Sequence, residues 1–260
     1  MNEPLPLPPL EMRQLVGPTD PTFFDNPKGS MVFPDIPADK QQTVFDFGCG
    51  CGRIARKLIQ QNPPPTKYVG IDLHKGMIRW CQQNLKPHAE SFDFFHHDTQ
   101  NIGFNPHGNI NPLPFPVEDN SFKMVLSWSV FTHLIEAQVS FYLKEVSRIL
   151  EKDGIFLSTW FTFDKQDFPM MQSFQNALYI NAIDPTNATI FDRGWLKTVV
   201  QDAGLRIIKI SPPAVKGFQW VIQMAHINEE YPEVDFPPDL APIGLNRPPA
   251  PGGNVSQIGL

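Results

Sequence analysis

The sequence predicts a doubly wound α/β fold, in which a mostly parallel sheet of seven strands is closed by an antiparallel hairpin near the C-terminus. The first observation is that short apolar runs alternate with segments of helical periodicity between residues 43 and 203. The second is that two extended runs then follow each other with no room for a helix between them. Strands joined without a crossover pair antiparallel, so these two runs are expected to form a hairpin.

Turn residues separate the elements, because most prolines lie between the periodic segments. The expected strands are residues 43–47, 67–72, 92–98, 122–129, 154–161, 205–211 and 217–226. The expected helices are residues 52–61, 76–85, 135–150 and 193–203. The last helix ends at Gly204, a residue type that commonly follows a helix.

The composition suits one globular domain, since 41% of the residues are hydrophobic and 18% are charged. We expect an N-terminal segment over residues 1–40, a sheet domain over 41–228 and a proline-rich tail over 229–260. The N-terminal segment and two insertions, 103–116 and 162–192, are expected to cover the substrate, because loops on a rigid sheet commonly carry specificity. The tail is either an ordinary terminus or a linker to a fused or partner domain.

The charge pattern argues against some classes of partner. A formal net charge of -6 and the lack of a basic cluster argue against a nucleic-acid substrate. The first residues lack the basic start and apolar block of a secretory signal, and no apolar run approaches membrane-spanning length. We therefore expect a cytoplasmic protein that acts on a small molecule or peptide and contacts no membrane.

A glycine-rich stretch, "VFDFGCGCGRIARKL", directly follows the first expected strand. In this fold ligands bind outside the carboxyl ends of the strands, where Gly48, Gly50 and Gly52 would let a ligand approach the main chain. A glycine-rich turn without a ligand is the alternative.

The cysteines of this stretch do not predict a metal site. Cys49, Cys51 and Cys81 cannot supply the four thiolates of a structural zinc site. His96 and His97 could assist only if both faced the same ion, and adjacent residues of a strand point to opposite faces. We interpret the cysteines as thiols that act as small spacers.

The spacing of the glycines separates two classes of cofactor. Dinucleotide-binding loops normally read G-x-G-x-x-G, whereas this loop reads G-x-G-x-G and is preceded by Asp46. The motif "DFGCGCG" resembles the first motif of the class I S-adenosylmethionine-dependent methyltransferases. The resemblance implies a Rossmann-like methyltransferase fold and S-adenosylmethionine as cofactor, with S-adenosylhomocysteine as product. A nicotinamide-dependent reductase is disfavoured by the glycine spacing and by the final hairpin.

The ends of the later strands carry further residues that match this family. Asp72 closes the second strand, where a carboxylate can accept hydrogen bonds from both ribose hydroxyls, although it could instead cap the next helix. The resemblance implies that Leu73 covers the adenine and that Asp98, at the end of the third strand, accepts from the adenine amino group. The segment "SWSVFTHL" resembles the family's segment beside the methionine part of the cofactor. The cofactor-binding residues implied are Asp46, Gly48, Cys49, Gly50, Asp72, Leu73, Asp98, Thr99 and Ser129.

His133 is the candidate catalytic base, because it follows the fourth strand near the expected methyl group. An alcohol or amine acceptor must lose a proton, whereas a carboxylate acceptor needs no base. The alternative is that His133 caps or packs the next helix.

The lead-in "LPPLEMRQLVGPTDPTFFDNP" resembles bacterial methyltransferases of natural products, peptides or glycans. These include the methyltransferase part of cyanobactin methyltransferase–prenyltransferases, which form methyl esters at peptide carboxyl ends. This resemblance favours O-methylation of a carboxylate in a peptide or other natural product. The alternatives are O- or N-methylation of a sugar or other small hydroxyl or amine acceptor, and a cofactor-binding regulator without turnover.

Overall fold

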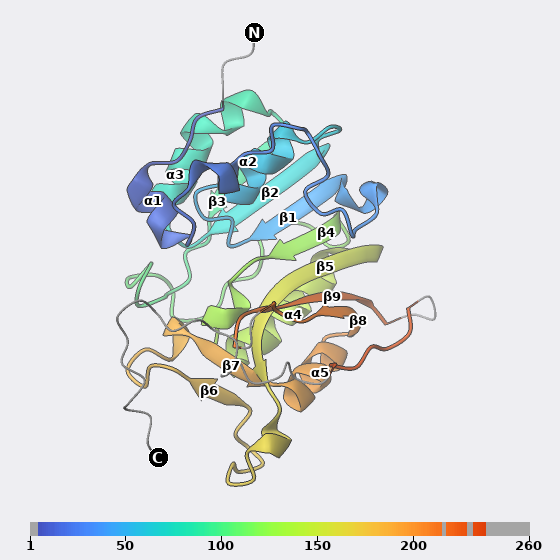
Figure 1. The fold of residues 1–260 in the computed structure, drawn as a ribbon. Coiled ribbons are helices and arrows are strands. Elements are labelled where there is room, and N and C mark those ends of the chain that lie inside the picture. The colour runs from blue at the N-terminus through green and yellow to red at the C-terminus, as the bar shows by residue number, and fades with distance from the viewer. Residues whose placement is uncertain (1–4, 215–216, 228–230, 238–260) are drawn as a thin grey trace, which may run out of the picture.

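The strands form one mostly parallel sheet in the computed structural model, which describes residues 5–214, 217–227 and 231–237 (Figure 1). They are β1 (Thr43–Phe47), β2 (Lys67–Asp72), β3 (Phe92–His96), β4 (Phe122–Ser127), β5 (Leu150–Phe163), β6 (Ala177–Tyr179), β7 (Thr189–Asp192), β8 (Leu205–Ser211) and β9 (Trp220–His226). β3, β2, β1, β4 and β5 lie side by side in this order and run parallel. β9 runs antiparallel along β5, and β8 pairs with β9. This arrangement confirms the doubly wound fold with its C-terminal hairpin.

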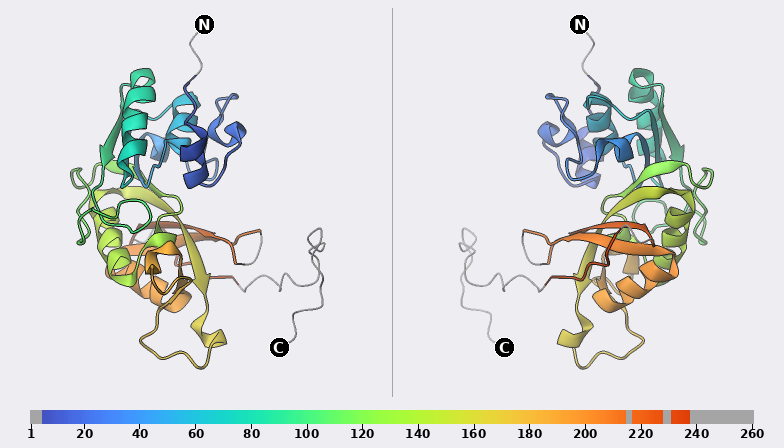
Figure 2. Two further views of the ribbon diagram at one scale, coloured as in Figure 1. Left: turned by 90° about the vertical axis from the view of Figure 1, so that its left-hand side faces the viewer. Right: turned by 90° about the vertical axis from the view of Figure 1, so that its right-hand side faces the viewer.

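Helices cover both faces of the sheet (Figures 1 and 2). They are α1 (Leu10–Leu15), α2 (Arg53–Gln60), α3 (Lys75–Asn84), α4 (Glu136–Ile149) and α5 (Arg193–Asp202). Successive residues of β1 point to opposite faces, so Val44 packs in the cluster that contains α2 and α3, and Phe45 in the cluster that contains α4 and α5. Because both faces are buried, β1 has a nearly continuous apolar sequence.

Aromatic rings pack densely around β1. The ring centroid of Phe45 lies 4.8 Å from that of Phe115 and 5.3 Å from that of Phe122. Phe45 is fully buried, and truncating such a residue to alanine costs about 3–5 kcal/mol. This packing fixes the position of β1 and hence of the glycine loop that follows it.

Arg56 anchors the N-terminal segment to helix α2. Its buried guanidinium donates hydrogen bonds to the carbonyl oxygens of Leu5 at 2.8 Å, Pro6 at 3.0 Å and Phe24 at 2.9 Å. It also forms an ion pair with Asp25. The segment contains the short helix α1, which the surrounding prolines conceal in the sequence.

The strands β6 and β7 and the full length of β5 were not predicted from the sequence. β5 extends beyond the expected range of 154–161 at both ends. Its residues 161–163 pair parallel with residues 190–192 of β7, and β7 pairs antiparallel with β6. Because these short strands depend on partners distant in sequence, they show no local strand pattern. Figure 2 shows the connection between β5 and β6 projecting from the molecule.

The described part of the expected tail packs against the sheet domain. The ring of Phe236 lies 5.7 Å from that of Trp220, and the guanidinium of Arg193 lies over both rings. Lys197 forms ion pairs with Glu233 and Asp235. Contacts to the domain therefore continue past the expected boundary at residue 228, while residues 238–260 lie outside the described residues. Among the residues that the structure describes, no helix is long and apolar enough to cross a membrane.

Candidate active site

The carboxyl ends of β1, β2 and β4 open into a cavity of about 350 Å³. The N-terminal segment closes one side of this cavity with Leu15, Val16 and Gly17. Of the sequence-predicted site residues, nine line the cavity: Asp46, Gly48, Cys49, Gly50, Asp72, Leu73, Thr99, Ser129 and His133. Sequence reasoning did not identify Arg53, Thr186 or Gln219, which line it as well.

The loop after β1 requires glycine at two positions. Gly48 and Gly50 adopt φ angles of +84° and +56°, in the left-handed region that other residues rarely occupy. A Cβ atom on Gly48 would lie 2.1 Å from Val130 Cγ2, and one on Gly50 would lie 2.8 Å from Val16 Cγ1. The loop therefore brings bare main chain to the cavity wall, which is the property that a closely bound ligand needs.

Asp72 is the last residue of β2, and its carboxylate accepts hydrogen bonds from two backbone N–H groups. Its Oδ2 accepts from Gly50 N at 2.8 Å, and its Oδ1 accepts from His74 N at 2.7 Å. Burial raises the pKa of Asp72, and these two N–H groups act in the opposite direction. Each carboxylate oxygen has a second lone pair, so Asp72 can hold the loop and still accept hydrogen bonds from a ligand.

Asp46 presents an unpaired oxygen at the same cavity. Its Oδ2 accepts from the hydroxyl of Tyr68 at 2.7 Å, whereas its buried Oδ1 has no partner among the described residues. Burial raises the pKa of Asp46 to about 7, although the hydroxyl of Tyr68 favours the ionised form. Arg53, at the start of α2, lines the cavity, and its positive charge also favours the carboxylate. The site thus offers a carboxylate oxygen and a guanidinium at one end.

His133 also lines the cavity, in a single 3₁₀ turn between β4 and α4. Its Nδ1 is 3.0 Å from the carbonyl oxygen of Thr186, in the insertion between β5 and α5. A carbonyl can only accept, so Nδ1 carries the proton and donates it to this bond. In the neutral ring Nε2 is then the atom with a free lone pair, and no described residue forms a hydrogen bond with it.

Ser129 has strained backbone at the end of β4. It adopts a φ angle of 61°, uncommon for a residue with a side chain. Its N–H donates to Thr159 Oγ1 at 2.8 Å, and its hydroxyl donates to Gln219 Oε1 at 2.9 Å. Bonds to two different strand regions hold this conformation, which turns the chain toward His133.

Asp98, the residue expected to reach the adenine, is not among the residues that line the cavity. β3 ends at His96, so Asp98 lies in the loop beyond the strand rather than at its end. Its exposed carboxylate accepts from the side-chain amides of Asn105 at 3.0 Å and Asn109 at 3.3 Å. Asp98 organises its own loop, whereas its neighbour Thr99 lines the cavity.

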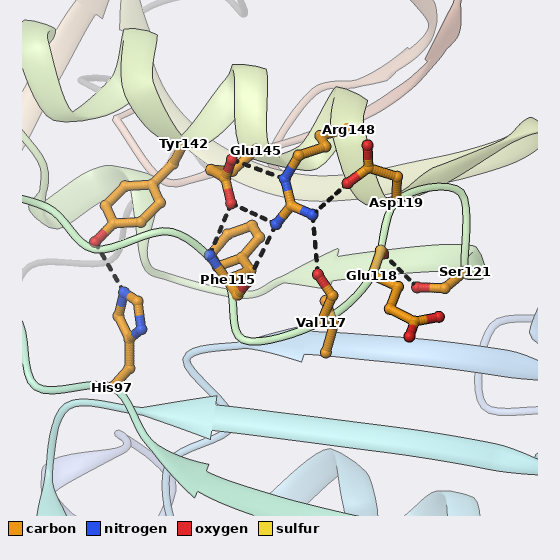
Figure 3. A network of polar contacts seen from close by, with 9 residues as sticks. All are labelled: His97, Phe115, Val117, Glu118, Asp119, Ser121, Tyr142, Glu145 and Arg148. Atoms are coloured by element: carbon orange, nitrogen blue, oxygen red, sulfur yellow. Dashed lines mark hydrogen bonds and ion pairs between the residues drawn. The ribbon is translucent and has the colours of Figure 1, made fainter.

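His97 belongs to a buried polar network beside the cavity (Figure 3). Its Nε2 shares a hydrogen bond of 3.0 Å with the hydroxyl of Tyr142, which is 3.2 Å from Thr99 Oγ1. Burial lowers the pKa of His97 to about 4, so the ring is neutral near pH 7. A neutral, hydrogen-bonded imidazole fixes the loop after β3 without adding charge.

Arg148 fixes the loop that precedes β4, as Figure 3 shows. Its guanidinium donates to both carboxylate oxygens of Glu145, at 2.9 and 2.7 Å, and to the carbonyl oxygens of Phe115 and Val117. The backbone N–H of Phe115 donates a hydrogen bond of 2.7 Å to Glu145 Oε2. The rings of Phe115 and Tyr142 are stacked, with their centroids 5.5 Å apart. This contact connects the hydrogen bonds of Arg148 and Glu145 to the polar network of His97.

The three cysteines are buried free thiols. Burial raises the pKa of each, for Cys51 to about 12, so all three are protonated near neutral pH. Within the described part of the chain, no group of three or more His, Cys, Asp or Glu side chains is placed to hold a metal ion.

The fold and the cavity together define a class of protein. A doubly wound sheet with a glycine loop after β1 and carboxylates at neighbouring strand ends is an α/β protein that binds a nucleoside-containing cofactor across the strand ends.

Comparisons with known proteins specify the family. Residues 44–154 match the family described as methyltransferase domain. The ribosomal protein L11 methyltransferase of Alkaliphilus metalliredigens is 25% identical over 142 residues, or 55% of this chain and 38% of that protein. Phthiotriol/phenolphthiotriol dimycocerosates methyltransferase 1 of Mycobacterium ulcerans is 30% identical over 116 residues, or 45% of this chain and 36% of that protein. This chain thus matches less than half the length of these curated relatives.

A solved structure agrees with the family in fold. The SAM-dependent methyltransferase of Aquifex aeolicus superposes with a TM-score of 0.53 at 15% identity, over 85% of this chain and 100% of that one. Residues 44–154 thus match a methyltransferase domain, and the fold around them is that of an S-adenosylmethionine-dependent methyltransferase.

The residues present fit this cofactor. The glycine loop leaves the main chain uncovered where a Cβ atom would collide, and Asp72 retains free lone pairs suited to ribose hydroxyls. The unpaired Oδ1 of Asp46 suits an ammonium group, and the guanidinium of Arg53 suits a carboxylate. These two side chains of opposite charge match the two charged groups of the methionine part.

Proposed function

We propose that the protein is an O-methyltransferase that acts on a small molecule or peptide and uses His133 as its general base. The observation that carries the proposal is the hydrogen bond between His133 Nδ1 and the carbonyl oxygen of Thr186. It selects the ring tautomer whose Nε2 can take a proton, in a residue that lines the same cavity as Asp46 and Arg53.

The chemistry needs few groups from the protein. Bound S-adenosylmethionine supplies an electrophilic sulfonium methyl group. An acceptor hydroxyl that received this methyl group would leave S-adenosylhomocysteine behind and would give its proton to His133 Nε2. The carbonyl of Thr186 stabilises the imidazolium that results, because it accepts from the protonated Nδ1. The N-terminal segment lines the cavity with Val16 and Gly17, which would limit the access of water on that side.

The charges of the cavity favour a hydroxyl acceptor over the carboxylate that the sequence favoured. Arg53 is the one lysine or arginine among the lining residues, and it stands beside Asp46. Apart from the sulfonium of the bound cofactor, a carboxylate acceptor would therefore meet no lysine or arginine in the described lining away from Asp46, so its desolvation would cost more than that of a hydroxyl. The curated relatives are named for different acceptors, a ribosomal protein and phthiotriol dimycocerosates, so their names favour neither choice.

Turnover by wild type and His133→Ala on matched alcohols and acids tests the proposal. If the acceptor is a hydroxyl, the substitution should lower kcat by about 10²–10⁴-fold while the affinity for S-adenosylhomocysteine stays unchanged. His107→Ala, which alters an exposed histidine outside the cavity, is the matched control.

Two results would contradict the proposal. Methylation of acids alone, with a loss of less than about tenfold in His133→Ala, would assign the carboxylate acceptor instead. Tight binding of S-adenosylmethionine without transfer to any acceptor would favour the regulator alternative.

A further inference from the structure

A second cavity, of about 360 Å³, lies beside the far end of β5. Five aromatic side chains line it, together with Leu178 and Ile190: Phe161, Phe163, Phe168, Phe218 and Trp220. None of these residues lines the cofactor cavity.

The apolar wall of this cavity follows from the strand register. Phe161 of β5 is paired with Ile190 of β7, which is paired with Leu178 of β6, so the three side chains form one row on one face. All three are only partly buried in the fold. Phe218, in the connection between β8 and β9, also lines this cavity and is 64% exposed. An exposed aromatic ring and a half-buried apolar row that line one cavity leave a surface that a ligand can cover.

Residues that line the second cavity are near neighbours in the chain of residues at the first. Ser129, which lines the cofactor cavity, donates to Thr159 Oγ1 at 2.8 Å. Phe161 follows Thr159 by two residues on the same side of β5, a spacing of about 7 Å along a strand. The β8–β9 connection forms part of both walls, since Gln219 lines the first cavity and its neighbours Phe218 and Trp220 line the second.

The charge of the second cavity restricts its ligand. Two carboxylates, Asp164 and Asp167, are among the lining residues, and the described lining includes no lysine, arginine or histidine. Arg193 lies nearby, since it donates to Thr162 at 3.3 Å and lies over Trp220, but it is not among the lining residues. The two lining carboxylates therefore disfavour an anionic group. These carboxylates would not repel an uncharged or cationic apolar group.

We propose that this cavity binds the remote, apolar part of the methyl acceptor, a group that is uncharged or cationic and is often aromatic. The inference rests on the proposed function, since the reacting hydroxyl lies at His133 while the apolar part extends along β5 past Thr159. Phe218 then determines specificity by covering the bound group.

A matched pair of fluorescent probes tests the cavity without any methyl transfer. N-phenyl-1-naphthylamine is neutral, and 1-anilinonaphthalene-8-sulfonate adds an anionic group to the same skeleton. The neutral probe should bind wild type at least tenfold more tightly than the anionic one. Phe218→Ala should weaken the neutral probe about tenfold, because it removes an aromatic contact. Phe174→Ala is the control, since this ring is 76% exposed and lines neither cavity.

A panel of acceptors then separates this inference from the proposed function. The panel combines two reacting groups, hydroxyl and carboxylate, with two remote groups, phenyl and carboxylate. Phenyl-bearing members should be preferred, and Phe218→Ala should raise their KM about tenfold without changing the KM of the cofactor. A preference for acids at the reacting end contradicts the proposed function alone. Equal use of acceptors with a phenyl and with a carboxylate remote group would overturn this inference. Equal affinity of Phe218→Ala and Phe174→Ala for the neutral probe would overturn it as well. If no member of the panel is methylated, the binding of the two probes alone tests the second cavity.

Discussion

The carboxylate of Asp72 accepts a hydrogen bond of 2.8 Å from the backbone N–H of Gly50, so the end of β2 fixes the glycine loop that follows β1. Two neighbouring strands therefore build one ligand wall. The same carboxylate accepts from His74 at 2.7 Å and so positions the start of α3. Both interpretations that the sequence left open, a ligand site and a helix start, are compatible with this geometry.

Asp72→Ala should weaken the binding of S-adenosylhomocysteine by roughly a hundredfold. The substitution removes charge-assisted bonds to the ribose and loosens the N–H of Gly50, losses that together cost about 2–3 kcal/mol. Asp72→Asn, which retains one acceptor oxygen, should lose less. Titration calorimetry measures both, and an affinity in Asp72→Ala equal to that of wild type would remove Asp72 from the cofactor site.

Asp46→Asn should abolish a pH dependence of stability that the wild type shows between about pH 4 and 7. The pKa of Asp46 is raised to about 7 by burial, against about 3.9 in an unfolded chain. The folded state thus retains a proton that the unfolded state has lost, so stability is full below about pH 4 and falls as the pH rises to 7, by up to about 4 kcal/mol.

Urea unfolding at pH 4.5 and pH 7.5 measures this effect, with Asp93→Asn as a half-exposed control. Binding of S-adenosylmethionine at pH 6 should in addition release protons from wild type and not from Asp46→Asn, because an ammonium beside Oδ1 favours the carboxylate. Calorimetry in buffers of different ionisation enthalpy detects this release. Identical proton release by both proteins would contradict the assignment of the ammonium to Asp46.

Asp98→Ala should leave the affinity for S-adenosylhomocysteine within about twofold of wild type, since small surface changes outside a site are nearly neutral. It should instead speed hydrogen exchange at Asn105 and Asn109, whose side-chain amides each lose one of two acceptors. A tenfold loss of affinity with unchanged exchange would restore the adenine role that the sequence indicated.

Arg56→Ala should destabilise the protein by about 3–5 kcal/mol, because it leaves buried carbonyl groups without donors and breaks the pair with Asp25. The N-terminal segment should then be cut earlier in limited proteolysis, and cofactor binding should weaken as Val16 leaves the cavity wall. Arg79→Ala, at an exposed position of α3, is the control. Equal proteolysis of the two variants would show that other contacts hold the segment.

The strand ends differ in how well the sequence located them. β2 ends at Asp72 as predicted, because the apolar run and the following turn coincide there. The third apolar run continues to Asp98, yet β3 ends at His96, the partner of Asp72 in the ladder. A parallel strand pairs only as far as its neighbour extends, so Asp98 lies two residues beyond the end of β3.

The sequence by itself determined the doubly wound sheet, the glycine loop and the carboxylates Asp46 and Asp72, because periodicity, glycine conformation and helix starts are interactions between residues close in the chain. Only the tertiary structure decided that the carbonyl of Thr186 selects the tautomer of His133, that β6 and β7 form, and that a second apolar cavity lies beyond Thr159. These features join segments tens of residues apart, so they depend on how the whole chain packs and have no local pattern that could predict them.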